Sequence, residues 1–594
     1  MKAIILAAGI GRRMQPLTNA VHKTLLKING RTIIEGIMDN LINNGISDVI
    51  IATGYRSAEL KEFVSAHYAN INVSYVHNER FAETNNIHSL ALVFDSVKIS
   101  DDILLIESDL IFEEKVIQRI INSPYANVAL LDHFKSGMDG TVVTVSEQVV
   151  TGIIPPHLQG AGFDFSDKYK TLNIYKFSKD FCNTTFKQLL TYYSQTIDDN
   201  CYYELILGIL IYIQKETIYA EIINTELWAE IDDPNDLRVA EFIFDKTKRL
   251  ESLDAAQGGC WNNDMLDFCF IRNMYFPNNS IFSELKNSLV KLCQNYGSSQ
   301  KILNKKLEFY LGIQPGKVNL LNGLSQVYPI LSLLWGDKKF LMPEPTFGEY
   351  KRLFKNSIFY ADRVDIDLAY IQQRAKDCAV VVFVNPNNPT GSAIDSSAII
   401  AFAAQARDKI IIVDESFIDF SRFSSLIPLL EESALENVIV LKSLSKSLGI
   451  PGLRLGFVYS CNDQYNRLIR EALPIWNINS VAEHFLEIIL KHKNSIEMSF
   501  AKTIKDREIF LSALNKLTFV KKAYNSQANF ILVEFKDDAK LKGLVASLLS
   551  EYSIYVKDVS PKFNDGKFYL RFAVRLPQEN QRLIECLSAC LLKG

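Results

Sequence analysis

Two blocks with different chemistry lie far apart in the chain, and together they require at least two separately folded parts. Residues 1–27, MKAIILAAGIGRRMQPLTNAVHKTLLK, combine glycines with basic side chains. Residues 443–457, SLSKSLGIPGLRLGF, are centred on Lys446 and follow NPNNPTG (385–391) and VDESFIDF (413–420). At 594 residues, the chain is also longer than one hydrophobic core normally holds.

Apolar runs alternate with amphipathic stretches throughout, which predicts α/β architecture. Three early runs predict buried strands: residues 2–8, 47–55 and 102–110. Residues 32–44 have helical spacing and are followed by Gly45 as a stop, so a parallel strand–helix–strand unit is expected. Later runs predict the strands of a second sheet and the last strand of the chain: residues 380–386, 409–415, 437–443 and 568–574.

The chain is expected to divide into two domains and a short linker. We place an N-terminal domain at residues 1–246, a linker at 247–257 and a C-terminal domain at 258–594. Residues 236–250 predict a terminal helix, whereas residues 255–263 show no helical or strand period. No internal repeat relates the two halves, so two different folds are expected.

The charge, cysteine content and apolar runs of the chain limit the classes of function that it can have. The formal net charge of −4 gives no support for binding to nucleic acid or to a membrane surface. The nine cysteines include no CxxC pair, which is typical of reduced thiols. The apolar run at residues 3–8 is too short for a signal peptide, and no later run is long enough to cross a membrane. A cytoplasmic protein is expected.

The N-terminal block has the features of a phosphate-binding loop. Gly9 and Gly11 allow backbone amides to approach phosphate oxygens, and Arg12, Arg13 and Lys23 can offset triphosphate charge. The string LAAGIGRRMQPLT followed by HKTLLKINGRTIIE resembles the sugar-nucleotide and phosphocholine nucleotidyltransferases. That resemblance implies a Rossmann-like domain in which Arg12 and Lys23 are catalytic. The implied nucleotide-binding residues here are Leu6, Ala8, Gly9, Gly11, Arg12 and Lys23.

Two aspartates resemble the paired magnesium ligands of the same family. Asp109 ends LLIESD, where a strand would deliver it to the crevice of an open sheet, and Asp232 lies in WAEIDDPNDL. Mg²⁺ prefers carboxylate oxygens and bridges substrate phosphates. Either aspartate alone is also explained as a loop end or a helix cap, and Asp232 or Asp233 could cap the helix that follows.

Two further segments resemble the choline-phosphate cytidylyltransferases. NERFAETNNIHSLALV (78–93) matches the region that faces the nucleotide, which implies base recognition by Thr84, Asn85 and Asn86; a polar turn is the alternative. DDNCYYELIL (198–207) matches the stretch near the acceptor, and Tyr203 and Glu204 are predicted to hold a primary amine there. Alternatively, Tyr202 and Tyr203 form the packed face of a helix. The implied reaction is attack on the α-phosphorus by a phosphate or phosphonate oxygen, with pyrophosphate leaving.

The C-terminal block fits a pyridoxal phosphate (PLP) site. Lys446 can condense with an aldehyde cofactor, and Asp414 can keep a pyridinium nitrogen protonated. NPNNPTG, DESF and SLSKS–GLRLG together resemble fold-type I aminotransferases of the histidinol-phosphate branch. The other predicted cofactor ligands are Asn388 for the ring oxygen, Ser325, Gln326, Ser443, Ser445 and Arg454 for the phosphate, and Phe347 for stacking on the ring. Alternatively, Phe347 is a phenylalanine of the hydrophobic core. The resemblance also implies that Arg571 binds a substrate carboxylate or phosphonate.

The reaction at this second site has two candidates. Phe417 stands where the family often has tyrosine, and WNINSVA (476–482) with AVR (573–575) leans toward threonine-phosphate decarboxylases. Decarboxylation therefore competes with transamination.

Both halves point to a small amine that carries a phosphoryl group, such as 2-aminoethylphosphonate. The whole arrangement resembles the bifunctional 2-aminoethylphosphonate cytidylyltransferase–transaminases. This implies CTP, Mg²⁺, PLP, an amino donor and a homodimer formed through the C-terminal domain. One alternative is a phosphoserine- or threonine-phosphate-type decarboxylase fused to a phosphoethanolamine or phosphocholine cytidylyltransferase. Another is that one half is a non-catalytic dimerisation module, although Lys446, Asp414, Asp109 and Asp232 are all present.

Overall fold

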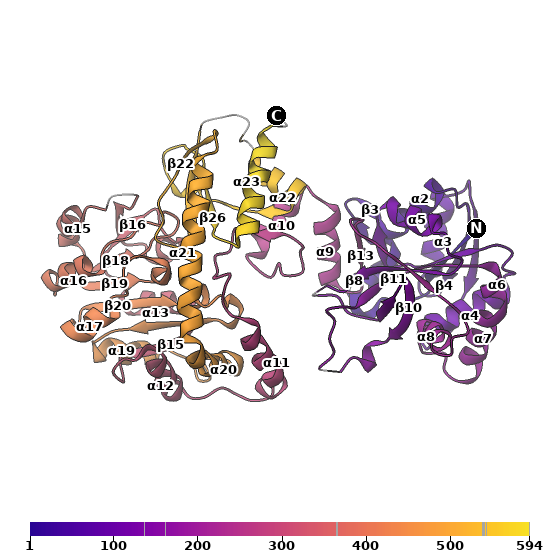
Figure 1. Cartoon of the computed structure of the whole chain (residues 1–594), viewed down its shortest axis with the longest axis horizontal. Coiled ribbons are helices and arrows are strands. Elements are labelled where there is room, and N and C mark those ends of the chain that lie inside the picture. The colour runs from indigo at the N-terminus through magenta and orange to yellow at the C-terminus, as the bar shows by residue number, and fades with distance from the viewer. Residues whose placement is uncertain (136, 161, 364–365, 537–540, 542, 593–594) are drawn as a thin grey trace. The chain divides into compact units, whose positions relative to one another are not determined.

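The computed structural model describes residues 1–135, 137–160, 162–363, 366–536, 541 and 543–592. It forms two compact units, Met1–Asp264 and Met265–Gly594, shown in Figure 1. The last two residues of the predicted C-terminal domain lie outside the described residues. Within the described residues, none of the helices combines the length and apolarity needed to cross a bilayer.

Unit 1 is built on a sheet with the strand order β5-β4-β1-β6-β11-β8-β12-β10-β9. Its strands are β1 (Lys2–Ala7), β4 (Asp48–Thr53), β5 (Asn72–His77), β6 (Ile103–Glu107), β8 (Val128–His133), β9 (Val142–Ser146), β10 (Val149–Ile154), β11 (Tyr169–Phe177) and β12 (Tyr219–Ile222). A separate two-stranded antiparallel sheet joins β7 (Leu110–Phe112) and β13 (Trp228–Glu230). Its longer helices are α2 (Ile33–Asn43), α3 (Ser57–His67), α4 (Asn86–Ser96), α5 (Glu114–Asn122), α7 (Lys187–Thr196), α8 (Glu204–Tyr212), α9 (Pro234–Phe244) and α10 (Arg249–Ala256).

The predicted parallel strand–helix–strand unit is present. β1 pairs in parallel with both β4 and β6. Between β1 and β4, Thr32 and Glu35 form a capping box at the start of α2, and Gly45 follows its end with a φ of +76°. Successive residues of β1 serve different cores, because Ile4 and Ile5 belong to separate buried clusters on the two faces of the sheet.

The predicted helix over residues 236–250 is interrupted. α9 ends at Phe244 and α10 begins at Arg249. Between them, the Asp245 carboxylate accepts hydrogen bonds from the backbone N and the hydroxyl of Thr247 at 3.2 and 2.6 Å. Such local side-chain bonds compete with helical ones, so the helix stops here and α10 occupies the expected linker.

Unit 2 is built on a sheet with the strand order β15-β21-β20-β19-β18-β16-β17. These strands are β15 (Val318–Asn322), β16 (Phe340–Glu344), β17 (Ser357–Ala361), β18 (Val380–Val384), β19 (Ile410–Asp414), β20 (Val438–Ser443) and β21 (Leu455–Tyr459). A second sheet joins β22 (Val520–Ala523), β23 (Phe530–Phe535), β26 (Tyr569–Ala573) and β25 (Lys557–Asp558).

The helices of unit 2 surround these sheets, and the long α21 is the most visible in Figure 1. They are α11 (Asn279–Cys293), α12 (Gln300–Leu311), α13 (Val327–Trp335), α14 (Gly348–Leu353), α15 (Leu368–Arg374), α16 (Ser396–Gln405), α17 (Ile427–Ser433), α18 (Leu444–Ser447), α19 (Asp463–Glu471), α20 (Ser480–Ile489), α21 (Lys493–Asn515), α22 (Leu544–Tyr552) and α23 (Pro577–Leu592). The strands predicted at residues 380–386, 409–415 and 437–443 are present as β18, β19 and β20, and they are parallel neighbours. Their carboxyl ends place Asp414 and Ser443 at one edge of the sheet.

Candidate active sites

The chain turns sharply after β1, and this turn forms part of a large pocket in unit 1. Gly11 has a φ of +64°, and a Cβ there would lie 3.1 Å from Cγ2 of Thr18. The Thr18 hydroxyl donates to the Gly11 carbonyl at 2.9 Å and fixes the turn. The pocket has a volume of about 730 Å³, within the range of small-molecule sites.

The pocket brings together most of the residues predicted for the first reaction. It is lined by Leu6, Ala8, Gly9, Gly11, Arg12, Lys23, Thr84, Asn85, Asn86, Asp109, Glu204 and Asp232. Tyr203 is not brought there, because its ring is buried against Tyr175 at 5.9 Å in the core. The neighbouring Tyr202 lines the pocket instead.

Lys23 joins the two predicted metal ligands. Its Nζ lies 2.9 Å from Oδ2 of Asp109 and 2.9 Å from Oδ1 of Asp232, and Arg13 contacts the other Asp232 oxygen at 2.7 Å. Burial disfavours the charge on Lys23, but the two aspartates together raise its pKa above the usual value. Burial acts in the same way against the charge on Asp232, and Lys23 and Arg13 nevertheless lower its pKa. Oδ1 of Asp109 is buried without a hydrogen-bond partner among the described residues, so it remains available to a cation.

The three residues predicted to recognise the base already have internal partners. The Thr84 hydroxyl donates to the Arg80 carbonyl at 2.9 Å, and the Asn85 side chain accepts from the backbone N of Asn86 at 2.9 Å. Asn86 donates to Glu107 at 3.0 Å and accepts from the backbone N of Tyr203 at 3.0 Å. Asn86 therefore orients a pocket carboxylate, a role that the sequence did not indicate.

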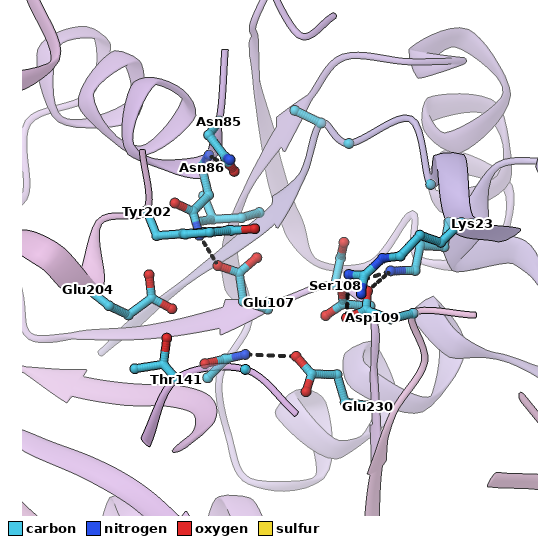
Figure 2. Close-up of a pocket in the computed structure, with 18 of the residues that line it drawn as sticks. Lys23, Asn85, Asn86, Glu107, Ser108, Asp109, Thr141, Tyr202, Glu204 and Glu230 are labelled. Atoms are coloured by element: carbon cyan, nitrogen blue, oxygen red, sulfur yellow. Dashed lines mark hydrogen bonds and ion pairs between the residues drawn. The ribbon is translucent and has the colours of Figure 1, made fainter. Parts of the chain in front are cut away.

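Three glutamates gather in another part of the same pocket, as Figure 2 shows for Glu107, Glu204 and Glu230. Glu230 accepts from Lys170 at 2.9 Å and from Asn173 at 3.0 Å. Oε2 of Glu204 is buried with no hydrogen-bond partner in the described part of the chain. Burial raises the pKa of Glu204 to about 7, and it also raises the pKa of Glu107. The positive charge near these glutamates is therefore too small to keep all of their carboxyl groups ionised.

Glu107 and Glu230 were missed at the sequence level, although a shared pattern marks them. Each stands two residues before a predicted metal ligand, as Glu-Ser-Asp (107–109) and Glu-Ile-Asp (230–232). Each glutamate is the last residue of its strand, and the aspartate follows in the turn, so this spacing could have placed each glutamate near an aspartate.

In unit 2, Lys446 and Asp414 lie at the ends of neighbouring strands. Lys446 is in α18, directly after β20, and burial, followed by the charges of Arg571 and Arg454, lowers its pKa to about 8. Asp414 ends β19 and accepts hydrogen bonds from the hydroxyls of Tyr350 at 2.9 Å and Ser416 at 2.6 Å. A half-buried lysine with a lowered pKa and a buried, hydrogen-bonded carboxylate at the ends of neighbouring strands are the groups needed to hold PLP.

The predicted phosphate ligands form a second part of this site. Arg454 donates to the Ser325 hydroxyl at 2.9 Å, and a Cβ at Gly323 would lie 2.4 Å from Nη2 of Arg454. Ser443 and Ser445 are buried at the end of β20 and the start of α18. Gln326 instead bonds internally, accepting from the backbone N of Asn322 at 2.9 Å and donating to Asn477 at 2.8 Å.

The remaining predicted residues lie around the same site. Phe347 is 39 % exposed, so it is not a core phenylalanine. Arg571 donates to the Asn388 side chain at 2.8 Å and to the Cys269 carbonyl. Phe417 is buried with its ring 5.1 Å from that of Phe530. The donor set as a whole fits PLP with a negatively charged substrate.

Comparison with known proteins identifies both units. Residues 275–587 match the family model for aminotransferase class I and II, and residues 2–131 match the model for nucleotidyl transferase. A crystal structure of histidinol-phosphate aminotransferase from Clostridium acetobutylicum aligns with a TM-score of 0.50 at 26 % identity, covering 56 % of this chain and 100 % of that chain. These matches confirm the two predicted fold classes and show that the chain is an enzyme.

Two curated relatives differ in how much of the chain they share. CMP-5'-(3-aminopropyl)phosphonate synthase from Streptomyces rubellomurinus is 27 % identical over 603 residues, covering 99 % of this chain and 95 % of the relative. L-serine phosphate decarboxylase from Campylobacter jejuni is 27 % identical over 354 residues, covering 55 % of this chain and 88 % of the relative.

Proposed function

This chain belongs to the aminotransferase class I and II family, and we propose that it is a bifunctional enzyme that makes 2-aminoethylphosphonate and couples it to CMP. At the unit 2 site, an amino group would pass from an amino donor to phosphonoacetaldehyde. At the unit 1 site, a phosphonate oxygen of the product would attack the α-phosphorus of CTP. The bond from that phosphorus to the bridging oxygen would break, and pyrophosphate would leave.

The observation that carries this proposal is the charge distribution in the unit 1 pocket. One part holds Lys23, Arg12 and Arg13, which suit a triphosphate. Another part holds three glutamates, and one oxygen of Glu204 is buried without a hydrogen-bond partner among the residues that the structure describes. A primary ammonium has three N–H donors and one positive charge, so it would satisfy these acceptors. A trimethylammonium group would bring no donors.

The charged residues of the unit 1 site, together with Asn86, would have distinct parts in this reaction. Asp109 and Asp232 would hold Mg²⁺, which neutralises charge on the phosphate oxygens when bound. Lys23 keeps the two carboxylates together and adds positive charge near the departing pyrophosphate. Asn86 holds Glu107 in position for the amine.

The unit 2 residues would bind and orient the second set of reactants. When bound, PLP supplies the aldehyde that exchanges amino groups and a ring that accepts electrons. Lys446 would carry protons on Nζ, since its lowered pKa of about 8 leaves part of it neutral near physiological pH. Asp414 would keep the ring nitrogen protonated, while Arg454 and Ser325 would hold the cofactor phosphate.

The relative from Streptomyces rubellomurinus supports an aminoalkylphosphonate as the acceptor, because its similarity runs through both units. Its name specifies a three-carbon chain, whereas we propose the two-carbon compound. The relative from Campylobacter jejuni supports a second candidate, in which phosphoserine loses CO₂ and the resulting phosphoethanolamine is coupled to CMP. Phe417, which places no hydroxyl in this part of the site, also favours that candidate.

Pyrophosphate release across a matrix of nucleotides and acceptors tests the proposal. The acceptors are 2-aminoethylphosphonate, 3-aminopropylphosphonate, phosphoethanolamine and phosphocholine, each with CTP, ATP, GTP and UTP. We expect CTP with 2-aminoethylphosphonate to give the highest kcat/KM. Equal use of phosphocholine would overturn the proposed amine recognition. In parallel, release of CO₂ from phosphoserine without transamination of phosphonoacetaldehyde would favour the second candidate.

A further inference from the structure

Three cationic side chains converge beside the cofactor residues of unit 2. Lys557 on β25 is the direct cross-strand partner of Arg571 on β26. Directly paired residues of antiparallel strands project from the same face of a sheet, and two like charges in this position normally destabilise it. Lys562 lies in the turn between these strands, and its Nζ donates to the Thr346 carbonyl at 2.8 Å. Thr346 precedes Phe347, the predicted ring-stacking residue.

The charges of these cations act on one another. Burial, then Arg571, then Lys557 lower the pKa of Lys562 to about 8. Burial also lowers the pKa of Arg571, and the negative charge of the neighbouring Asp267 opposes this shift. That carboxylate already accepts from the backbone N of Cys269 at 2.8 Å and of Phe270 at 2.9 Å. Folding thus keeps positive charges together at a cost, as is typical of a site awaiting an anion.

Arg571 retains hydrogen-bonding capacity for such an anion. Its Nη1 and Nη2 have the partners Asn388 and Cys269, but Nε is buried without a partner among the described residues. The cofactor phosphate is expected at Arg454 and Ser325, which are hydrogen-bonded to each other at 2.9 Å. The cluster around Arg571 is therefore left for the substrate.

We propose that Lys562 acts with Arg571 as a subsite for the doubly charged phosphoryl group of the unit 2 substrate. A carboxylate has two oxygens and one charge, which one guanidinium can match. A phosphoryl group has a third oxygen and a second charge, and the Lys562 ammonium supplies the matching donor and charge. Lys562 would thus determine specificity for phosphoryl over carboxylate compounds. This inference rests on the proposed function only in assuming a phosphoryl substrate, either a phosphonate or a phosphate ester.

Equilibrium binding to the PLP-loaded full-length protein tests the subsite with two probes, methylphosphonate and acetate. We expect Lys562→Met to weaken methylphosphonate binding at least about tenfold, since one charged hydrogen bond is lost, and acetate binding less than about twofold. Lys562→Arg should restore most of the affinity for methylphosphonate. Lys567→Met is the matched control, because Lys567 is a nearby lysine whose ion pairs are with Glu534 and Asp565.

The thermal stability of the variant distinguishes a binding role of Lys562 from a structural role. Relief of repulsion in the cluster should offset the lost hydrogen bond to the Thr346 carbonyl. The Tm of Lys562→Met should therefore stay near that of the wild type, with the visible absorbance of the bound cofactor intact. Equal weakening of both probes, or no weakening of methylphosphonate, would refute the subsite. A lower Tm with loss of cofactor absorbance would show that Lys562 is structural instead.

Substrate assays distinguish this subsite from the proposed function. If the wild-type protein transaminates phosphonoacetaldehyde, Lys562→Met should raise its KM at least about tenfold and spare the KM of a carboxylate amino donor. If phosphoserine is decarboxylated instead, the proposed function fails, but the same rise in KM should appear for phosphoserine. A normal KM for whichever phosphoryl substrate is used would overturn the subsite alone.

Discussion

At the scale of single residues, Glu204 links acceptor binding to pH. Burial raises the pKa of its carboxyl to about 7, so the group is largely protonated below pH 7 and ionised above it. Only the carboxylate can accept a charged hydrogen bond from the ammonium. The KM for 2-aminoethylphosphonate should therefore rise as pH falls through 7. Losing that bond is worth about 1.5–3 kcal/mol, or roughly tenfold or more in KM.

The Glu204→Gln variant is the control for this pH dependence. The acceptor's own phosphonate also titrates near this range, as phosphate monoesters do with a second pKa of about 6. The difference between wild type and variant isolates Glu204, because every other titratable group is retained. The variant should show the raised KM at all pH values and a normal KM for CTP. Parallel profiles for the two proteins would show that Glu204 does not hold the amine.

Lys446 and Asp109 should each control one reaction. Lys446→Ala should abolish the visible absorbance of bound PLP and the transaminase reaction while leaving cytidylyl transfer intact. Asp109→Asn should reduce cytidylyl transfer by orders of magnitude, because stabilisation of charge by a metal is worth several kcal/mol, and should leave the absorbance unchanged. Borohydride reduction that still fixes the cofactor to the Lys446→Ala chain would show that another lysine is used.

At the scale of elements, the cap of α9 holds a predicted metal ligand in place. Asp233 accepts from the backbone N of Asn235 at 2.7 Å and of Asp236 at 3.0 Å. Asp236 in turn accepts from the backbone N of Asp232 at 3.0 Å. Asp233→Ala should cost about 1 kcal/mol of unfolding free energy and, by loosening Asp232, lower kcat for cytidylyl transfer roughly tenfold.

A second helix cap offers the matched control for α9. Asp367 caps α15 in unit 2 by accepting from the backbone N of Ala369 at 2.9 Å and of Tyr370 at 3.0 Å. Asp367→Ala should cost a similar amount of stability, measured by chemical denaturation, without changing cytidylyl transfer. An equal loss of that activity in both variants would indicate general destabilisation rather than positioning of Asp232.

The elements also show what the sequence could predict. Buried parallel strands such as β1 and β19 are continuous apolar runs, so their positions, and that of Asp414 at a strand end, were predictable. The break between α9 and α10 depends on a side-chain bond of Asp245 and could not be read from periodicity. Tyr203 was placed in the pocket although its neighbour Tyr202 lies there, because the start of α8 decides which ring faces inward.

At the scale of the whole molecule, the fusion was predictable because each unit carries its own motif. The Glu-x-Asp spacing could place Glu107 and Glu230 near the aspartates, but nothing in the sequence brought them together with Glu204. Glu107, Glu204 and Glu230 come from β6, α8 and β13, which are far apart in the sequence. Only folding places them in one pocket. The partner groups Lys170 and Asn173 on β11 give no motif of their own, so their contacts with Glu230 required the structure.

We predict that the whole protein self-associates through unit 2. α11 packs against α20 on one side and leaves Phe282, Leu289 and Val290 exposed on another. Phe282 and Leu289 are seven residues apart and lie on the same side of the helix, with Val290 at the edge of that side. Exposed apolar patches mark interaction sites, and twofold homodimers are the commonest soluble oligomers.

Charge substitutions on α11 test this homodimer. The double variant Phe282→Glu/Val290→Glu should sediment as a monomer in analytical ultracentrifugation, while the wild type sediments with twice the mass of one chain. Ile509→Glu on α21 is the control, because Val290 and Ile509 are both 59 % exposed. It should remain dimeric if the interface involves α11 and not apolar exposure in general. A wild-type monomer at micromolar concentration, or a dimeric double variant, would contradict an interface built on this face.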